Sequence, residues 1–291
     1  MLLYLLLIRY EKIVISSTIK DSEEILISFC HFIGLKSQTN GGGIFISSIY
    51  DLQIGESVFL GCSSVVYGGA VYKSSGKLVI GKCCFKSCST STGDNNWGNA
   101  IYTSAGEIGC NTSSILKCGE SGSPHGDTPI VGIEEKADSN HINISFCYGV
   151  ACGSHFYVKS NEITNHSFSL VAYCNAPCVF ESGSNSRTVH QYFNVIGNHA
   201  PLGIIYYYYS ATGVFQNCVF VGNTGSSTIN GPITFTDCVS DVAYSGFNQS
   251  LNPWTLPLQQ FFDDECSFAI QVTKSHRIAW RMVFLANSLL G

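Results

Sequence analysis

The 291-residue sequence predicts an all-β solenoid, in which short parallel strands stack coil upon coil. Three observations predict this fold class: a segment that repeats without gaps, a fixed spacing between aromatic and glycine-led runs, and a polar surface built from small residues. Only 12% of the residues are charged, against about 25% in ordinary soluble proteins. A surface rich in Ser, Thr, Asn and Gly suits turns and strands better than exposed helices.

The clearest repeat lies between Tyr67 and Cys118. Eight residues recur thirty positions later: Gly68, Ala70, Val71, Tyr72, Ser74, Gly76, Phe85 and Cys88 return as Gly98, Ala100, Ile101, Tyr102, Ser104, Gly106, Ile115 and Cys118. Phe59 and Cys62 stand twenty-six positions before Phe85 and Cys88, and residues 41–45 repeat residues 68–72. A period in the twenties is typical of a solenoid, in which each turn packs only on its neighbours.

The repeat predicts columns of equivalent side chains. Stacked parallel strands lie about 4.8 Å apart, so we expect one apolar column of Phe59, Phe85 and Ile115 and a second column of Cys62, Cys88 and Cys118. The paired glycines are expected at tight corners, where φ is positive or the next coil approaches too closely for a side chain.

Taken in order, the chain divides into three regions. Residues 1–24 form an N-terminal lead-in whose apolar start, residues 1–9, is either a weak signal peptide or a first strand and cap. Residues 25–250 carry the strand signals of the β-helix, by coil length roughly eight to nine coils. Within them, Glu120 to Ala137 is expected to be a loop. Residues 251–291 are interpreted as a C-terminal cap or an altered tail.

Two late copies of the unit end in Asn, and one of them is an intact Phe-x-x-Asn motif. Phe220-Val221-Gly222-Asn223 follows Val195-Ile196-Gly197-Asn198 by twenty-five residues, so Asn takes the column that Cys holds earlier. Together with Gly68-Gly69-Ala70-Val71, this motif resembles the repeats of polymorphic outer-membrane proteins, which are surface adhesins. The resemblance implies a right-handed, single-stranded parallel β-helix of the pectin-lyase-like kind, exposed on a cell surface and used in adhesion.

Composition also bears on compartment and partners. Fourteen cysteines fit an oxidising compartment, and so do four candidate glycosylation sites at Asn111, Asn143, Asn165 and Asn248. Basic residues are few and scattered, which disfavours a nucleic-acid partner. No segment is long and apolar enough to span a bilayer. We therefore expect a cell-surface or secreted protein whose partner is a surface protein or a glycan.

A polysaccharide lyase or glycoside hydrolase is the alternative from a different class, because parallel β-helices host such enzymes. A glycosidase needs two carboxylates facing one cleft. The best candidates are Asp237, Asp241 and Arg187, but strand alternation does not place them on one face. Fold alone does not carry function, so no catalytic residue is assigned.

Soft metal ligands are available at Cys147, Cys152 and His155, or at Cys174 with Cys178. The doubled, tightly spaced pairs of a four-ligand zinc site are absent, so buried packing is the preferred interpretation and no cofactor is expected. His125 falls in the expected loop and is interpreted as solvated.

One strand offers a candidate ligand contact. Alternation along residues 204–209 turns two of the four tyrosines Tyr206, Tyr207, Tyr208 and Tyr209 outward, where they could bind a sugar ring or a partner protein. An aromatic ladder that reinforces the sheet is the structural alternative. The sequence thus predicts a non-enzymatic binding protein, with an enzyme or a purely structural, cytosolic repeat protein as the alternatives.

Overall fold

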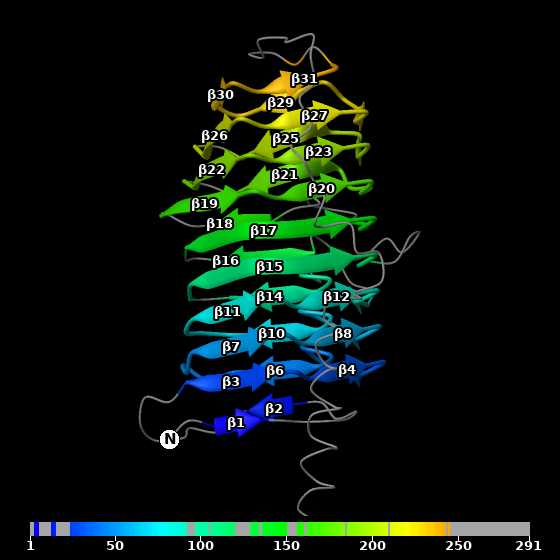
Figure 1. Cartoon of the computed structure of the whole chain (residues 1–291), viewed down its shortest axis with the longest axis vertical. Helices are drawn as coiled ribbons and strands as arrows, with labels where there is room; N and C mark the ends of the chain where they lie inside the picture. Colours follow the sequence, from blue (N-terminus) through cyan, green and yellow to red (C-terminus); the bar gives the residue numbers. More distant parts are fainter. Residues whose placement is uncertain are drawn as a thin grey trace, which may run out of the picture.

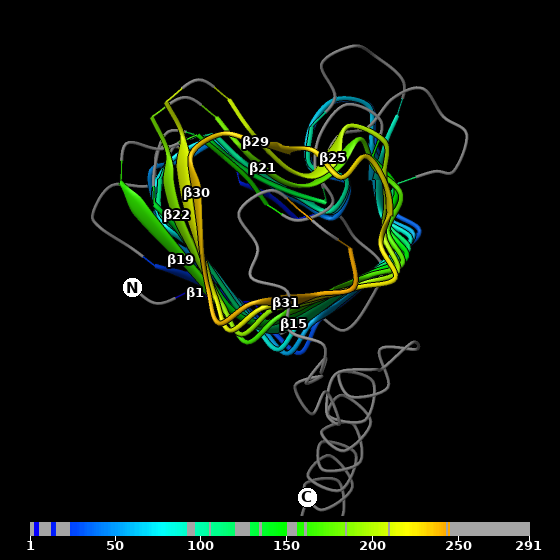
Figure 2. The ribbon, with the colours of Figure 1, turned by 90° about the horizontal axis from the view of Figure 1, so that it is seen from above.

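The predicted all-β, parallel solenoid is confirmed by the structure, which is a computed structural model of the chain. It describes residues 3–5, 13–15, 24–91, 97–104, 106–119, 129–133, 136–149, 156–159, 162–183, 185–208, 210–242 and 244. Within these ranges the regular secondary structure consists of β-strands alone. Successive strands stack in parallel, one level above another (Figure 1). Seen along the stack, the levels superimpose closely (Figure 2).

Three walls enclose the core. We call the first part of each turn wall 1: β1 (Leu3–Leu5), β3 (Ile25–Ser28), β7 (Leu52–Gly55), β11 (Leu78–Gly81), β15 (Ile108–Leu116), β17 (Ala137–Ser145), β19 (Ile163–Ser167), β22 (Arg187–Gln191), β26 (Thr212–Gln216) and β30 (Ile233–Thr236). Wall 2 follows: β4 (His31–Ile33), β8 (Val58–Leu60), β12 (Cys84–Lys86), the second halves of β15 and β17, β20 (Leu170–Ala172), β23 (Asn194–Ile196), β27 (Val219–Val221) and β31 (Val239–Ser240). Because β15 and β17 run through both walls, walls 1 and 2 form one 17-stranded sheet.

Wall 3 is a separate nine-stranded sheet. Its strands are β2 (Ile13–Ile15), β6 (Ile44–Ile46), β10 (Val71–Lys73), β14 (Ile101–Thr103), β16 (Ile130–Ile133), β18 (Phe156–Lys159), β21 (Cys178–Ser182), β25 (Gly203–Tyr207) and β29 (Ile229–Asn230). Short strands bridge walls 2 and 3: β5 (Lys36–Ser37), β9 (Ser63–Ser64) and β13 (Ser89–Thr90) form one strip, and β24 (His199–Ala200) and β28 (Thr224–Gly225) form another. The solenoid has about seven turns, fewer than the eight to nine coils expected from the coil length.

The register reproduces the repeat seen in the sequence. Val71 of β10 pairs with Ile44 below and Ile101 above. In wall 2, Phe85 pairs with Phe59 and with Ile115, and the rings of Phe59 and Phe85 stack with centroids 4.6 Å apart. The expected apolar column therefore exists, and it continues downward through Phe32.

A single residue with positive φ makes the first corner, between walls 1 and 2. At successive levels this residue is Phe29, Glu56, Lys82, Thr112, His141, Phe168, Tyr192, Asn217 and Asp237. The residue after it points inward, and where it is Ser or Cys it donates to the carbonyl two residues earlier, as Ser57 does to Gly55 at 2.8 Å. The bend thus leaves its interior carbonyl groups paired.

The second corner, at the end of wall 2, has the same design. Its positive-φ residues are Gly34, Gly61, Ser87, Lys117, Phe146, Tyr173, Gly197 and Gly222. Each is followed by an inward side chain of one column, which reads Leu35, Cys62, Cys88, Cys118, Cys147, Cys174, Asn198 and Asn223. The predicted cysteine column and its replacement by Asn at the late levels are both present.

Glycine-led corners before wall 3 also match the expectation. Gly68 has φ +62°, and a Cβ on Gly69 would lie 2.1 Å from the carbonyl oxygen of Asn99 on the next level. No other residue fits at Gly69 without moving backbone.

One expected loop is wrong in part. Glu120 to Ala137 contains strand β16 and the start of β17, because the β-branched pair Ile130 and Val131 continues wall 3 between β14 and β18. Residues 120–128 lie outside the described residues, as does the expected cap at 251–291. At the other end, β1 pairs with β3 and β2 with β6, so residues 3–5 and 13–15 belong to strands.

Candidate functional site

Aromatic side chains gather on the outer face of wall 3. Phe45, Tyr72 and Tyr102 occupy one register position on β6, β10 and β14. Their ring centroids are 5.2 and 5.6 Å apart with planes within 8° of parallel. The flanking residues Ile44 and Ile46 are buried in the core, so alternation points these rings outward.

Two further rings join this ladder from the segments that precede β10 and β14. Tyr67 stacks on Tyr102 with centroids 4.5 Å apart. Trp97 is tilted against both, by 56° and 44°. We call Phe45, Tyr67, Tyr72, Trp97 and Tyr102 the aromatic patch; all but Tyr102 are partly exposed. Because the rings stack on one another, Phe45 and Tyr72 present their edges to solvent, and Tyr102 is buried beneath Tyr67. The tilt of Trp97 keeps it out of the ladder.

The sequence contains a signal for part of this patch. Phe45, Tyr72 and Tyr102 occupy the same position of the repeated glycine-led unit. Equal positions in a stacked repeat lie on one face, so the three rings had to meet. Tyr67 precedes Gly68 and Trp97 precedes Gly98. Nothing in the repeat indicated that these two rings fold back over the ladder.

The tyrosines expected to contact a ligand are divided between the two faces of wall 3. Tyr206 and Tyr208 point outward and are partly exposed, with ring centroids 5.0 Å apart in an edge-to-face arrangement. Tyr207 is buried in the core, and its hydroxyl hydrogen-bonds Thr188 and His190. Tyr209 lies outside the described residues. Tyr206 shares its register position with Glu181 and Asn230, so no aromatic ladder is seen at those two neighbours.

The core next to Tyr207 is polar. His166 shares a 2.8 Å hydrogen bond with Ser139, and its ring stacks on His190, which stacks in turn on Phe215. Burial lowers the pKa of His166 to about 4. These groups resemble catalytic side chains in kind, but all are buried in the solenoid, so their arrangement is structural.

The weak catalytic candidates lie at separate corners. Asp237 is the positive-φ residue at the first corner of its level, whereas Asp241 follows β31 at the second corner and accepts the Gly222 N–H at 2.7 Å. Arg187 opens β22 at the opposite edge of wall 1 from the first corner, in register with Thr212. The three side chains are therefore not brought to one cleft.

The free cysteines in the described part of the chain are buried and serve packing. Cys147 and Cys174 belong to the buried column, and Cys174 accepts the Cys147 N–H at 3.4 Å. Cys178 donates to Glu181 at 3.6 Å. Burial raises the pKa of Cys83 to about 12 and that of Cys110 further, so these thiols stay protonated and unreactive at neutral pH.

Metal ligands do not cluster within the described ranges, where no three His, Cys, Asp or Glu side chains meet. Cys152 and His155 lie outside those ranges, as does His125. Lys73, fully buried at the end of β10, donates instead to the carbonyls of Ser48, Tyr50 and Ser75. Burial lowers its pKa to about 8.

The candidate glycosylation sites differ in exposure. Asn111 and Asn165 are exposed on the outer face of wall 1. Asn143 is buried in wall 2, where its side-chain oxygen accepts a hydrogen bond from Ser145. Asn248 lies outside the described residues. A glycan on Asn143 would require this part of the wall to open.

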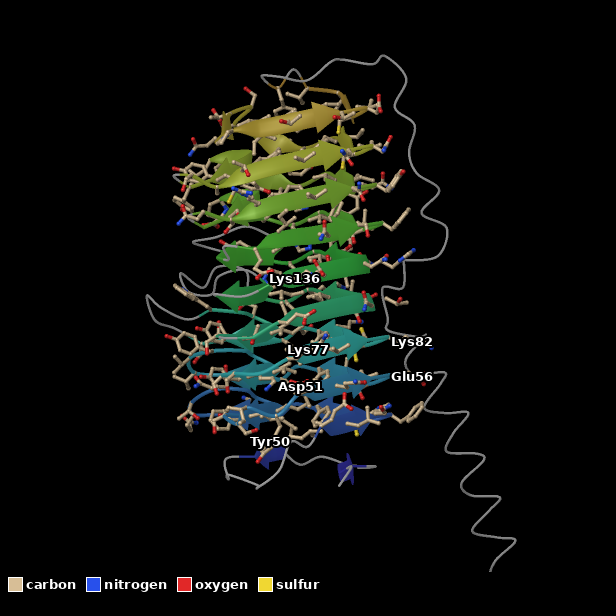
Figure 3. The ribbon with its side chains drawn as sticks, turned by 90° about the vertical axis from the view of Figure 1, so that its left-hand side faces the viewer. Tyr50, Asp51, Glu56, Lys77, Lys82 and Lys136 are labelled. Atoms are coloured by element: carbon tan, nitrogen blue, oxygen red, sulfur yellow. The ribbon has the colours of Figure 1, made fainter. Side chains whose placement is uncertain are left out.

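In the described part of the chain, charged side chains form scattered pairs. Glu56 pairs with Lys82 at neighbouring levels of the first corner, 3.4 Å apart (Figure 3). Lys77 pairs with Glu107 and Lys136 with Asp138 on the flank of wall 1. Among the described residues no helix is long and apolar enough to cross a membrane. Comparisons with protein-family models, curated proteins and solved structures found no match to this chain.

Proposed function

We propose that this chain is a non-catalytic binding protein, secreted or displayed at a cell surface, that engages a neutral glycan through the outer face of wall 3. The observation that carries the proposal is the aromatic patch. Partly exposed Tyr and Trp side chains combine apolar area with hydrogen-bonding groups, which is the combination that binding surfaces use.

The charge around the patch favours a neutral ligand. Strands β6, β10 and β14 carry one charged residue, Lys73, and its ammonium group is buried against backbone carbonyls. An acidic polymer would need exposed cations and a basic one exposed carboxylates. Tyrosine hydroxyls and the indole N–H instead suit the hydroxyl groups of a sugar chain, with a ring of the patch against an apolar sugar face.

The resemblance to polymorphic outer-membrane proteins supports display outside the cell. It rests on the Gly-Gly-Ala-Val motif, which leads into wall 3, and on the Phe-x-x-Asn motif, which ends wall 2 at the second corner. Exposed sequons at Asn111 and Asn165 support the same compartment, and so does the disulfide bond of Cys84. The separate positions of Asp237, Asp241 and Arg187 give no support to a lyase or a glycosidase.

The proposal is tested by binding to an array of neutral and acidic oligosaccharides. We expect binding to neutral chains, reduced at least tenfold in the double variant Tyr67→Ala/Trp97→Ala. Tyr173→Ala is the matched control, because Tyr173 is 50% exposed at the second corner, away from wall 3. A second double variant, Tyr206→Ala/Tyr208→Ala, tells whether the contact extends up the wall.

Two results would count against this function. Binding that survives the loss of both Tyr67 and Trp97 would remove the patch as the site. If the chain binds an immobilised protein but none of the glycans on the array, its ligand is a protein and not a glycan.

A further inference from the structure

A row of thiols runs up the interior of the solenoid at the end of wall 2. Five successive levels place a cysteine in the inward column of the second corner. We call these residues the thiol row: Cys62, Cys88, Cys118, Cys147 and Cys174. All five are free thiols, and each is at most 2% exposed. The row therefore gathers a soft ligand at regular intervals inside the core.

Every thiol of the row has the same orientation. Each Sγ lies 3.4–3.8 Å from the carbonyl oxygen of the inward wall 2 residue one level below. Each also lies 3.4–3.9 Å from the carbonyl oxygen two residues earlier in its own level. The thiols of adjacent levels interact along the whole row. Because equal orientations repeat at the spacing of stacked strands, neighbouring sulfur atoms lie about 4.8 Å apart, in line along the stack.

This spacing does not suit a disulfide. A disulfide needs two Cβ atoms about 3.8 Å apart, which is about 1 Å closer than parallel side chains in register. Backbone hydrogen bonds hold the levels apart at the column itself. The Gly119 N–H donates to the Cys88 carbonyl at 2.9 Å, and the Tyr148 N–H donates to the Cys118 carbonyl at 2.9 Å. We therefore expect the row to keep its thiols in oxidising surroundings.

The same spacing does suit a soft cation with two ligands. A thiolate–metal bond is about 2.3 Å long, so a cation bound in line between two thiolates spans about 4.6 Å. Thiolate ligands select Cu(I), a soft cation. Zinc instead requires four ligands around one point, and within the described ranges no three His, Cys, Asp or Glu side chains meet. The row thus favours a linear copper site over a tetrahedral zinc site.

Polar groups beside the row can stabilise both partners of such a bond. The carbonyl oxygen of Phe59 lies 3.6 Å from the Cys88 Sγ, so its negative end is close to a cation held between two levels. The backbone N–H of Cys147 donates to the Cys174 Sγ at 3.4 Å, and a hydrogen bond to sulfur favours the thiolate. Cation and thiolate therefore both have polar neighbours in this part of the core.

We propose that adjacent thiols of the row bind Cu(I) in linear sites with two sulfur ligands, and that the row holds two such cations. Each cation bonds to two sulfur atoms and displaces their two protons to solvent, and no electron is transferred. Five thiols in line form at most two separate pairs, so one thiol keeps its proton. The sites lie inside the solenoid, so this proposal and the glycan contact on wall 3 can fail independently.

The first corner supplies a matched pair and a matched single thiol. Cys218 and Cys238 occupy adjacent levels of its inward column and interact with each other. Cys83 is buried in the same column, but the levels below and above it carry Ser57 and Ser113. The spacing rule therefore predicts one cation for the pair and none for Cys83.

Counting bound copper by native mass spectrometry tests the sites. The full-length protein is refolded from urea without oxygen in the presence of Cu(I), so that burial does not bar entry. Loosely held metal is then removed with the Cu(I) chelator bicinchoninate. Cys118→Ser should bind as many ions as the unaltered protein, because two adjacent pairs remain. Cys88→Ser should lose one ion, and the double variant Cys88→Ser/Cys147→Ser should lose two, because no adjacent thiols remain in the row.

Two further variants serve as controls. Cys83→Ser should lose no ion, whereas Cys218→Ser should lose one. X-ray absorption of the loaded protein should find two sulfur neighbours for each copper and no third. Where Ser prevents folding, Asn replaces it, because Asn198 fills the column of the row one level higher.

Three results would overturn the proposal. One is an equal loss of copper from Cys118→Ser and Cys88→Ser, and another is full copper binding by the double variant. The third is failure of the row to react with an alkylating reagent in denaturant without reductant, because that result would show disulfides in place of thiols.

Discussion

His166 shows how a single buried side chain ties this fold to pH. Its ring lies in the interior column between Ser139 and His190, and burial lowers its pKa to about 4. The unfolded chain, with an ordinary pKa near 6.5, binds a proton between pH 6.5 and 4 that the folded chain does not. The stability contributed by neutral His166 is therefore complete above pH 6.5 and is lost as the pH falls toward 4, by up to about 3 kcal/mol.

The substitution His166→Phe should remove this acid sensitivity, because Phe215 and Phe235 occupy the same column above it. We expect the urea midpoint of the unaltered protein to fall more between pH 7.5 and pH 5 than that of the variant. His199→Gln is the control, since His199 is exposed on β24. An equal pH dependence in the variant and the unaltered protein would assign the effect to other groups.

At the scale of an element, the inward side chains that follow the second corner form hydrogen bonds from one level to the next. Asn198 accepts the Cys174 N–H at 2.9 Å and donates to the Val171 carbonyl at 2.9 Å. At lower levels a thiol donates to the corresponding carbonyl, as Cys88 does to Phe59 at 3.6 Å. The amide thus satisfies both a donor and an acceptor of the neighbouring level, whereas the thiol makes a longer, weaker bond.

Asn198→Ala should lower the free energy of unfolding by about 2–4 kcal/mol, because it strands a buried N–H and a buried C=O. Asn198→Cys should cost less, since Cys fills this column at five other levels, Cys62 to Cys174. Urea unfolding measures both, with Thr224→Ala on the exposed β28 as the control. Equal losses for Ala and Cys would show that shape, and not hydrogen bonding, sets the stability of the column.

For the molecule as a whole, the sequence predicted the fold because the number of residues between equivalent positions sets the register of the strands in a solenoid. Equal spacing placed Phe59, Phe85 and Ile115 in one column, and the glycine pairs marked the corners. The strand at Ile130 was missed because Gly and Pro signals around it hid a short β-branched run. The aromatic patch was missed since the positions of Tyr67 and Trp97 depend on how two segments fold over a neighbouring level.

Nearest-neighbour stacking also predicts how substitutions combine. Phe59→Ala should cost about 3–5 kcal/mol, and Asn198→Ala lies five levels, or about 24 Å, away. Their effects should add within about 0.5 kcal/mol. Phe59→Ala and Phe85→Ala, whose rings stack at 4.6 Å, should couple, so that the second costs less than the first. Urea unfolding of the two double variants checks this, and strong coupling between the distant pair would contradict a purely local stack.

The gap-free pairing of β10 with β6 below and β14 above has a consequence for inheritance. Each level recognises only the pattern that all levels share, so a tandem duplication of one turn in the gene would find its pairing partners already in place. The lengthened protein would keep the same faces and gain about 4.8 Å for each added turn. Recombination can therefore change the length of the molecule in steps of one turn, and no new complementary surface between turns has to evolve.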